Sequence, residues 1–155
     1  STFIMISVLP FYNKNILLAD DDKDDCLLFK NALEELPLSF NLTIVHNGEE
    51  LMHILNQENI PLPDFLFLDL YMPLKNGFEC LTEIKNNKRL SQLCVIIFST
   101  SYAPEVVEQL YKNCTQFYVR KPEDVERYKA VIYNALHLRN AEASPKQTTA
   151  GKFSV

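Results

Sequence analysis

The chain has 155 residues, of which 47% are hydrophobic and 23% charged, and its formal net charge is −5. This length and mixture are typical of one globular domain with a sizeable core. The acidic balance argues against general affinity for nucleic acid, and no apolar run approaches the roughly 20 residues that span a bilayer.

The four cysteines lie far apart in the sequence and include no C-x-x-C pair. They are Cys26, Cys80, Cys94 and Cys114. This spacing is poor for zinc, and a domain of this size does not need disulfides. The cysteines therefore predict buried free thiols and a reducing, cytoplasmic location.

The first strand and the first helix are predicted at Lys14–Asp20 and Lys23–Leu36. The strand is an apolar run bounded by polar residues, and the helix carries leucines near helical spacing. Asp22, Asp24 and Asp25 lie where a helix N-terminus favours negative charge and a capping side chain. We interpret these three acids as helix-start residues.

The rest of the chain alternates strand and helix with short polar joints. Further strands are predicted at Asn41–His46, Asp64–Asp69, Cys94–Ser99 and Gln116–Val119. The helices that follow them are predicted at Glu49–Glu58, from Phe78 towards Lys85, at Glu105–Lys112 and at Val125–Leu138. Such alternation predicts right-handed crossovers and a parallel sheet covered on both faces. The expected fold is α/β, a doubly wound (βα)5 three-layer sandwich with strand order 2-1-3-4-5.

The expected domain covers residues 14–139. Residues 1–13 form an N-terminal extension, and residues 140–155 are small and polar, which predicts a flexible C-terminal tail. The residues after the last helix are too few for a DNA-binding output domain.

Charged or hydroxyl side chains follow four of the five predicted strands. The first strand ends in Asp20 and Asp21, the third in Asp69 and the fourth in Ser99, while Lys121 follows the fifth. In open parallel sheets, ligands bind outside the carboxyl ends of the strands, where the strand order reverses. The first and third strands are neighbours there, so we expect their acids to converge.

Packed carboxylates raise one another's pKa values unless a positive partner joins them. All-oxygen ligation suits a hard divalent cation, and Mg²⁺ fits best. With Mg²⁺ on one side and Lys121 on the other, Asp69 would face two positive centres, and Ser99 would add a hydroxyl donor. This arrangement would stabilise a phosphoryl group attacked by Asp69, so the predicted chemistry is an aspartyl phosphate.

These residues resemble the receiver domain of two-component response regulators, a flavodoxin-like fold of the chemotaxis-regulator type. The resemblance covers roughly residues 14 to 138. The motifs that carry it are the Asp20-Asp21 pair, Asp69 within Leu68-Asp69-Leu70-Tyr71-Met72-Pro73, Gly77, Ser99 and Lys121-Pro122. They stand in order at the ends of successive strands.

The resemblance implies a metal site built around Asp69. Asp21 and Asp69 would ligate Mg²⁺ directly, Asp20 would help through water, and the backbone carbonyl of Tyr71 would be a further ligand. Asp20, Asp21 and Asp22 form a run of three acids, so the choice of pair depends on the register. We favour the first two, because the apolar strand ends at Ala19.

The resemblance also implies the roles of the remaining site residues. Ser99 would contact the phosphoryl group, with Thr100 as the alternative in a shifted register, and Lys121 would pair with the phosphoryl group. The Lys121–Pro122 bond is expected to be cis. Tyr118 occupies the family's aromatic switch position, and we group Thr100 with it as a switch residue.

The resemblance implies a stand-alone response regulator in a two-component phosphorelay. It would accept a phosphoryl group from a sensor histidine kinase or a histidine phosphotransfer protein and catalyse only its own phosphorylation and dephosphorylation. It would signal to an unknown downstream protein, as a monomer or transient dimer, through the face formed by Glu105–Lys112, Gln116–Val119 and Val125–Leu138. We expect no direct contact with nucleic acid or membrane.

Two alternatives remain open. One is a phosphorylation-independent interaction module with the same fold, against which the complete set of acids, hydroxyl and lysine argues. The other is a magnesium-dependent phosphohydrolase with an aspartate nucleophile. Such enzymes usually carry a second acid two residues after the nucleophile, and Tyr71 stands there.

Overall fold

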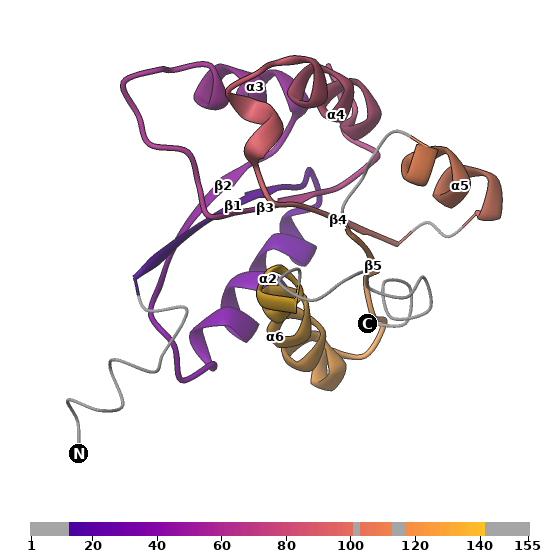
Figure 1. Cartoon of the computed structure of the whole chain (residues 1–155). Helices are drawn as coiled ribbons and strands as arrows, with labels where there is room; N and C mark the ends of the chain where they lie inside the picture. Colours follow the sequence, from indigo (N-terminus) through magenta and orange to yellow (C-terminus); the bar gives the residue numbers. More distant parts are fainter. Residues whose placement is uncertain (1–12, 101–102, 113–116, 142–155) are drawn as a thin grey trace.

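The computed structural model describes residues 13–100, 103–112 and 117–141 (Figure 1). Nearly all of the predicted N-terminal extension and C-terminal tail lie outside the described residues, as does Cys114. The other three cysteines are buried free thiols, as predicted.

Five parallel strands form one sheet in the order β2-β1-β3-β4-β5, which confirms the predicted topology. The strands are β1 (Lys14–Ala19), β2 (Phe40–Val45), β3 (Phe65–Leu68), β4 (Val95–Ser99) and β5 (Phe117–Arg120). All residues of β3 and β4 are buried, because helices cover both of their faces, whereas β2 alternates between partly buried and exposed residues. This pattern separates the central strands from the edge strand at β2.

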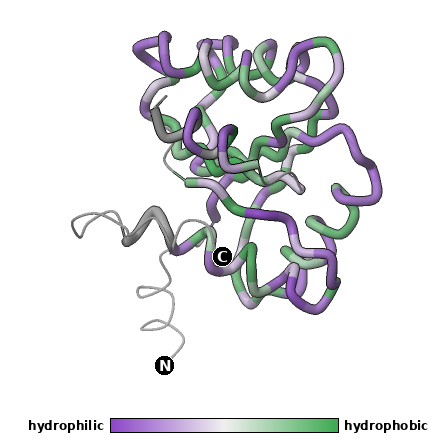
Figure 2. Tube along the Cα trace, turned by 90° about the vertical axis from the view of Figure 1, so that its right-hand side faces the viewer, coloured by the Kyte–Doolittle hydropathy of each residue, from purple (hydrophilic) through white to green (hydrophobic). Residues whose placement is uncertain are grey.

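The helices form the two outer layers of the sandwich (Figure 1). They are α2 (Lys23–Glu34), α3 (Gly48–Leu55), α4 (Gly77–Asn86), α5 (Pro104–Lys112) and α6 (Val125–Ala141), and a short 3₁₀ helix, η1, spans Leu90–Gln92. One core cluster joins the sheet to α2 and α6, and the other joins it to α3, α4 and Val106 of α5. Figure 2 shows hydrophobic segments in the interior and hydrophilic turns at the periphery.

Side-chain caps explain why the helices beside the acidic strand ends begin where they do. Asp22 caps α2, because its carboxylate accepts hydrogen bonds from the backbone N–H groups of Asp24 and Asp25. Asn76 and Glu79 form a reciprocal capping box at the start of α4. The interpretation of Asp22 as a helix-start residue is confirmed.

Two glycines at the starts of helices pack closely against the backbone of the loop between β3 and α4. A Cβ atom on Gly48 would lie 2.0 Å from the carbonyl oxygen of Lys75, and one on Gly77 would lie 2.2 Å from that of Asp69. The N–H of Gly77 also donates to the carbonyl of Leu70 at 2.8 Å. Helices α3 and α4 therefore hold this loop in place by close backbone packing.

Candidate functional site

The predicted site residues lie at the carboxyl ends of the strands. Asp20, Asp69 and Lys121 directly follow β1, β3 and β5, and Ser99 is the last residue of β4. The backbone N–H of Asp20 donates to Val45, that of Asp69 to Ala19 and that of Lys121 to Ser99. These bonds continue the strand ladder, so the backbone positions of the site are set by the sheet.

The described residues contain four buried polar or charged residues, and all four belong to the predicted site. They are Asp20, Asp69, Ser99 and Lys121. Burying such groups is costly unless they are paired. These four residues lie together at the carboxyl ends of the strands, where a polar cluster interrupts the otherwise apolar core.

Asp20, Asp21 and Asp69 converge at these strand ends. One carboxylate oxygen from each lies within 4.8 Å of the other two, and Asp21 is the exposed member of the three. The acids of β1 and β3 thus meet, as the strand order predicts. All of their donor atoms are oxygens, which is the ligand set that hard divalent cations prefer.

Lys121 enters this cluster from the end of β5. Its Nζ lies 2.5 Å from Asp20 Oδ2, 2.9 Å from Asp25 Oδ2 and 3.7 Å from Asp69 Oδ2. Burial alone would lower the pKa of Lys121, but the charges of Asp20 and Asp69 outweigh burial and hold that pKa above its ordinary value. Lys121 is therefore a permanent cation at neutral pH.

One ammonium group does not balance the acids around it. Burial raises the pKa of Asp20 to about 6, although Lys121 opposes this shift. Burial also raises the pKa of Asp69, against the effects of Lys121 and of hydrogen bonds from the Tyr71 N–H and the Ser99 side chain. A divalent cation would supply the missing positive charge, so the residues present fit such an ion.

The raised pKa of Asp20 predicts a specific pH dependence of stability in metal-free buffer. Because the folded-state pKa exceeds the ordinary value of 3.8, ionising Asp20 disfavours the folded state as pH rises through about 6. We expect Asp20→Asn to raise the free energy of unfolding by about 3 kcal/mol at pH 7. Urea unfolding with EDTA should show this gain shrinking towards pH 4; a gain that is constant with pH would contradict it.

The predicted hydroxyl and switch residues lie on β4 and β5. Ser99 is fully buried at the end of β4 and hydrogen-bonds the Asp69 carboxylate, whereas Thr100 is exposed. Tyr118 is buried in the core cluster shared with α3 and α4. Tyr71 is 51% exposed, and its ring meets that of Phe78 edge-on. The roles of these residues in phosphoryl chemistry and switching stay predictions.

Two features of the site differ from the sequence predictions. The Lys121–Pro122 bond is trans, as are all peptide bonds in the described residues, so the expectation of a cis bond is wrong. The trans form is the ordinary isomer of an X–Pro bond. Asp25 lies in the first turn of α2, as predicted, but it also pairs with Lys121. Sequence reasoning missed this pair, whose only signal was the closeness of Asp25 to the acids that end β1.

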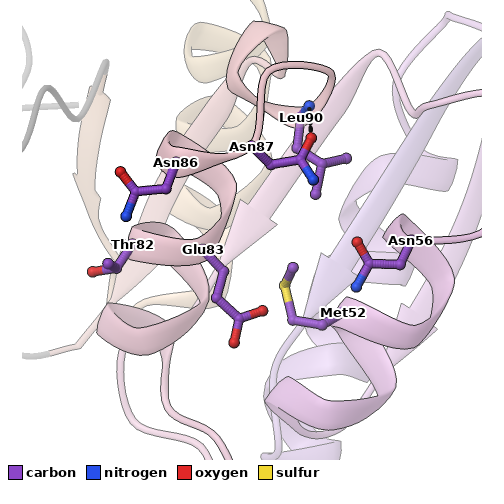
Figure 3. Close-up of a pocket in the computed structure, with 7 residues that line it drawn as sticks. All are labelled: Met52, Asn56, Thr82, Glu83, Asn86, Asn87 and Leu90. Carbon is purple, nitrogen blue, oxygen red and sulfur yellow. Dashed lines mark hydrogen bonds between the residues drawn. The ribbon is translucent and has the colours of Figure 1, made fainter.

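A groove of about 350 Å³ lies between α3 and α4, away from these acids (Figure 3). Its lining consists of Met52, Asn56, Thr82, Glu83, Asn86, Asn87 and Leu90. The one carboxylate in this lining, Glu83, is paired with Lys75. The Asn87 side chain accepts a hydrogen bond from the Leu90 N–H at 3.0 Å. The groove therefore lacks the converging charged groups found at the edge of the sheet.

The chain is thus a five-stranded doubly wound domain with a buried acid–lysine cluster at the carboxyl ends of its strands, and comparison with known families identifies its class. Residues 16–133 match the family described as Response regulator receiver domain. The chain belongs to this family, whose members are signalling modules. No described helix combines the length and the apolar character required for a membrane span.

Among curated proteins, the chain is 33% identical to response regulator Rcp1 of Synechocystis sp. over 117 residues, which cover 73% of this chain and 80% of that protein. The crystal structure of the phosphorylated cyanobacterial phytochrome response regulator RcpA is similar, with a TM-score of 0.78 and 29% identity over 86% of this chain and 99% of that one. The Mn²⁺-bound form of Rcp1 has a TM-score of 0.73 and 30% identity over 87% of this chain and 99% of that one. These likenesses confirm the flavodoxin-like receiver fold.

Proposed function

We propose that this chain accepts a phosphoryl group on Asp69 from a sensor histidine kinase or a histidine phosphotransfer protein, as one step of a two-component phosphorelay. The observation that carries the proposal is the convergence of Asp20, Asp21 and Asp69 with Lys121 in a chain of the receiver family. Residues 14–139 would form the receiver domain.

Asp69 is suited to be the nucleophile. Its carboxylate is held by hydrogen bonds from the Tyr71 N–H and the Ser99 side chain, and its side chain is 10% exposed, so a donor can reach it from solvent. An Asp69 oxygen would form the new O–P bond as the P–N bond to the donor imidazole breaks and the imidazole retains the electron pair. Ser99 and Lys121 would then contact the transferred oxygens.

Mg²⁺ is the cofactor we propose for this step. Asp20, Asp21, Asp69 and the backbone carbonyl of Tyr71 would hold it, with Asp20 acting through water. When bound, the ion would neutralise charge on the acids and on the phosphoryl oxygens. The related protein Rcp1 has been solved in a Mn²⁺-bound form, which supports a divalent cation as the cofactor.

The output would be a shift between two conformers, biased by new contacts of the phosphoryl group with Ser99 and Lys121. Thr100 and Tyr118 would transmit the change to the face formed by α5, β5 and α6. We infer that this face contacts an unidentified downstream protein in the cytoplasm. The chain itself would act as a monomer or as a transient dimer formed through the same face. We infer no direct role for nucleic acid or membrane, and no catalysis beyond the chain's own phosphorylation and dephosphorylation.

The test is incubation of the full chain with Mg²⁺ and a small phosphodonor such as acetyl phosphate, followed by intact mass spectrometry. We expect the mass of one phosphoryl group to be added and then lost slowly. Steady turnover of a phosphoester without a lasting adduct would favour a phosphohydrolase. No adduct from the small donor, and none from a phosphorylated histidine protein, would favour a phosphorylation-independent interaction module.

A further inference from the structure

Asp25 contacts the lysine of the site from outside the acidic cluster. It lies in the first turn of α2, its N–H donates to the Asp22 carboxylate at 3.1 Å, and its own Oδ2 is 2.9 Å from Lys121 Nζ. The Asp25 side chain is 23% exposed, whereas that of Lys121 is 4% exposed. Asp25 does not belong to the group of three acids whose carboxylate oxygens all lie within 4.8 Å of one another.

The three distances show on which side of the site the ammonium group lies. Lys121 Nζ is within hydrogen-bond distance of Asp20 and Asp25 but 3.7 Å from Asp69 Oδ2. Two of its three N–H donors are therefore directed to acids other than the proposed phosphoacceptor. A phosphoryl group on Asp69 would therefore compete with Asp20 and Asp25 for the charge and the position of this ammonium group.

The two competing acids are not equivalent. Asp20 belongs to the cluster proposed to hold the divalent cation, so a bound cation would share its charge. Asp25 lies outside that cluster and keeps its full charge for Lys121. Asp25 is therefore the acid that still attracts the lysine when the metal site is filled.

We propose that Asp25 is a positioning residue that holds Lys121 on the α2 side of the site and so competes with the phosphoryl group for the ammonium. This inference rests on the proposed function, since it concerns the regulation of the same site. Asp25 weakens the phosphorylated state, and its removal strengthens that state.

The test compares Asp25→Asn with wild type for binding of beryllofluoride, a phosphoryl analogue, to the full chain with Mg²⁺, measured by calorimetry. Asp25→Asn is expected to bind about fivefold more tightly, a size typical of a partly exposed ion pair. Asp25→Glu keeps the charge and is expected to bind like wild type. Asp24→Asn is the matched control, because it removes one exposed charge from the same helical turn and is expected to change little.

A second comparison tests whether Asp25 acts through Lys121. In a Lys121→Met background, Asp25→Asn is expected to leave beryllofluoride affinity unchanged. The double-mutant cycle consists of wild type, Asp25→Asn, Lys121→Met and the variant with both changes. Urea unfolding of these four proteins, with no metal or analogue, is expected to show coupling between the two residues. Affinity that stays equal or falls in Asp25→Asn, a gain that persists without Lys121, or an absence of coupling would each overturn the inference.

The same data separate the two proposals. If wild type binds beryllofluoride and takes up a phosphoryl group but Asp25→Asn binds no more tightly, the inference fails and the proposed function stands. If wild type does neither, the proposed function fails and the inference falls with it.

Discussion

Replacement of Asp69 by asparagine is expected to abolish the phosphoryl adduct completely while leaving the fold intact or slightly more stable. The amide has nearly the shape of the carboxylate but is a far weaker nucleophile at the same position. Burial raises the pKa of Asp69, so its charge disfavours the folded state in the absence of metal. Removing that charge should therefore raise the free energy of unfolding in the absence of Mg²⁺.

Two measurements on the same preparation check this result. Intact mass after treatment with acetyl phosphate and Mg²⁺ reports the adduct, and urea unfolding with EDTA reports stability. Asp21→Asn is the matched control, because it removes an exposed acid of the same cluster and leaves the nucleophile in place. That variant should still form the adduct, more slowly. An adduct of equal yield in Asp69→Asn would place the phosphoacceptor elsewhere and refute the assignment.

Gly77→Ala is expected to destabilise the fold strongly, although it adds only one methyl group. A Cβ atom there would lie 2.2 Å from the carbonyl oxygen of Asp69 and 2.7 Å from the Cα of Leu70. Both are backbone atoms at the end of a buried strand, so no side chain can rotate away. Glycine to alanine in a helix normally adds roughly 0.5–1 kcal/mol of stability. Here the clash should reverse the sign and cost about 3 kcal/mol.

Chemical denaturation and the adduct assay together test this prediction. Asn86→Ala, an exposed change at the end of the same helix, serves as the control and should leave both readouts near wild type. Gly77→Ala should also slow phosphorylation, because the clash displaces the backbone that carries Asp69. Wild-type stability in Gly77→Ala would show that the loop between β3 and α4 is not clamped as described.

The elements of the fold could be predicted because they depend on local patterns. The apolar runs that contain Phe65–Leu68 and Val95–Ser99 carry almost no polar residue, and the structure buries every position in both. Element ends were less accurate. Helix α2 ends at Glu34, two residues before its predicted end, and η1 was not predicted. Terminal turns are held by individual hydrogen bonds, which periodicity does not encode.

The convergence of Asp20, Asp21 and Asp69 could also be predicted, because it follows from strand order alone. Each of these acids follows a run of strand residues, and neighbouring parallel strands end at the same edge. The predicted geometry of the Lys121–Pro122 bond was wrong. It came from the family resemblance, and nothing in the residues themselves required the cis isomer.

By itself, the sequence determined the alternation of strands and helices, the order of the sheet and the carboxylates at the ends of β1 and β3. These features depend on local periodicity and on the limited ways in which such units can pack. Only the tertiary structure decided how Lys121 is shared among its acids. Asp25 and Lys121 are 96 residues apart, and they meet because the first turn of α2 and the residue after β5 both lie at the carboxyl ends of the strands. Contacts between distant residues depend on side-chain distances after packing, which no local pattern specifies.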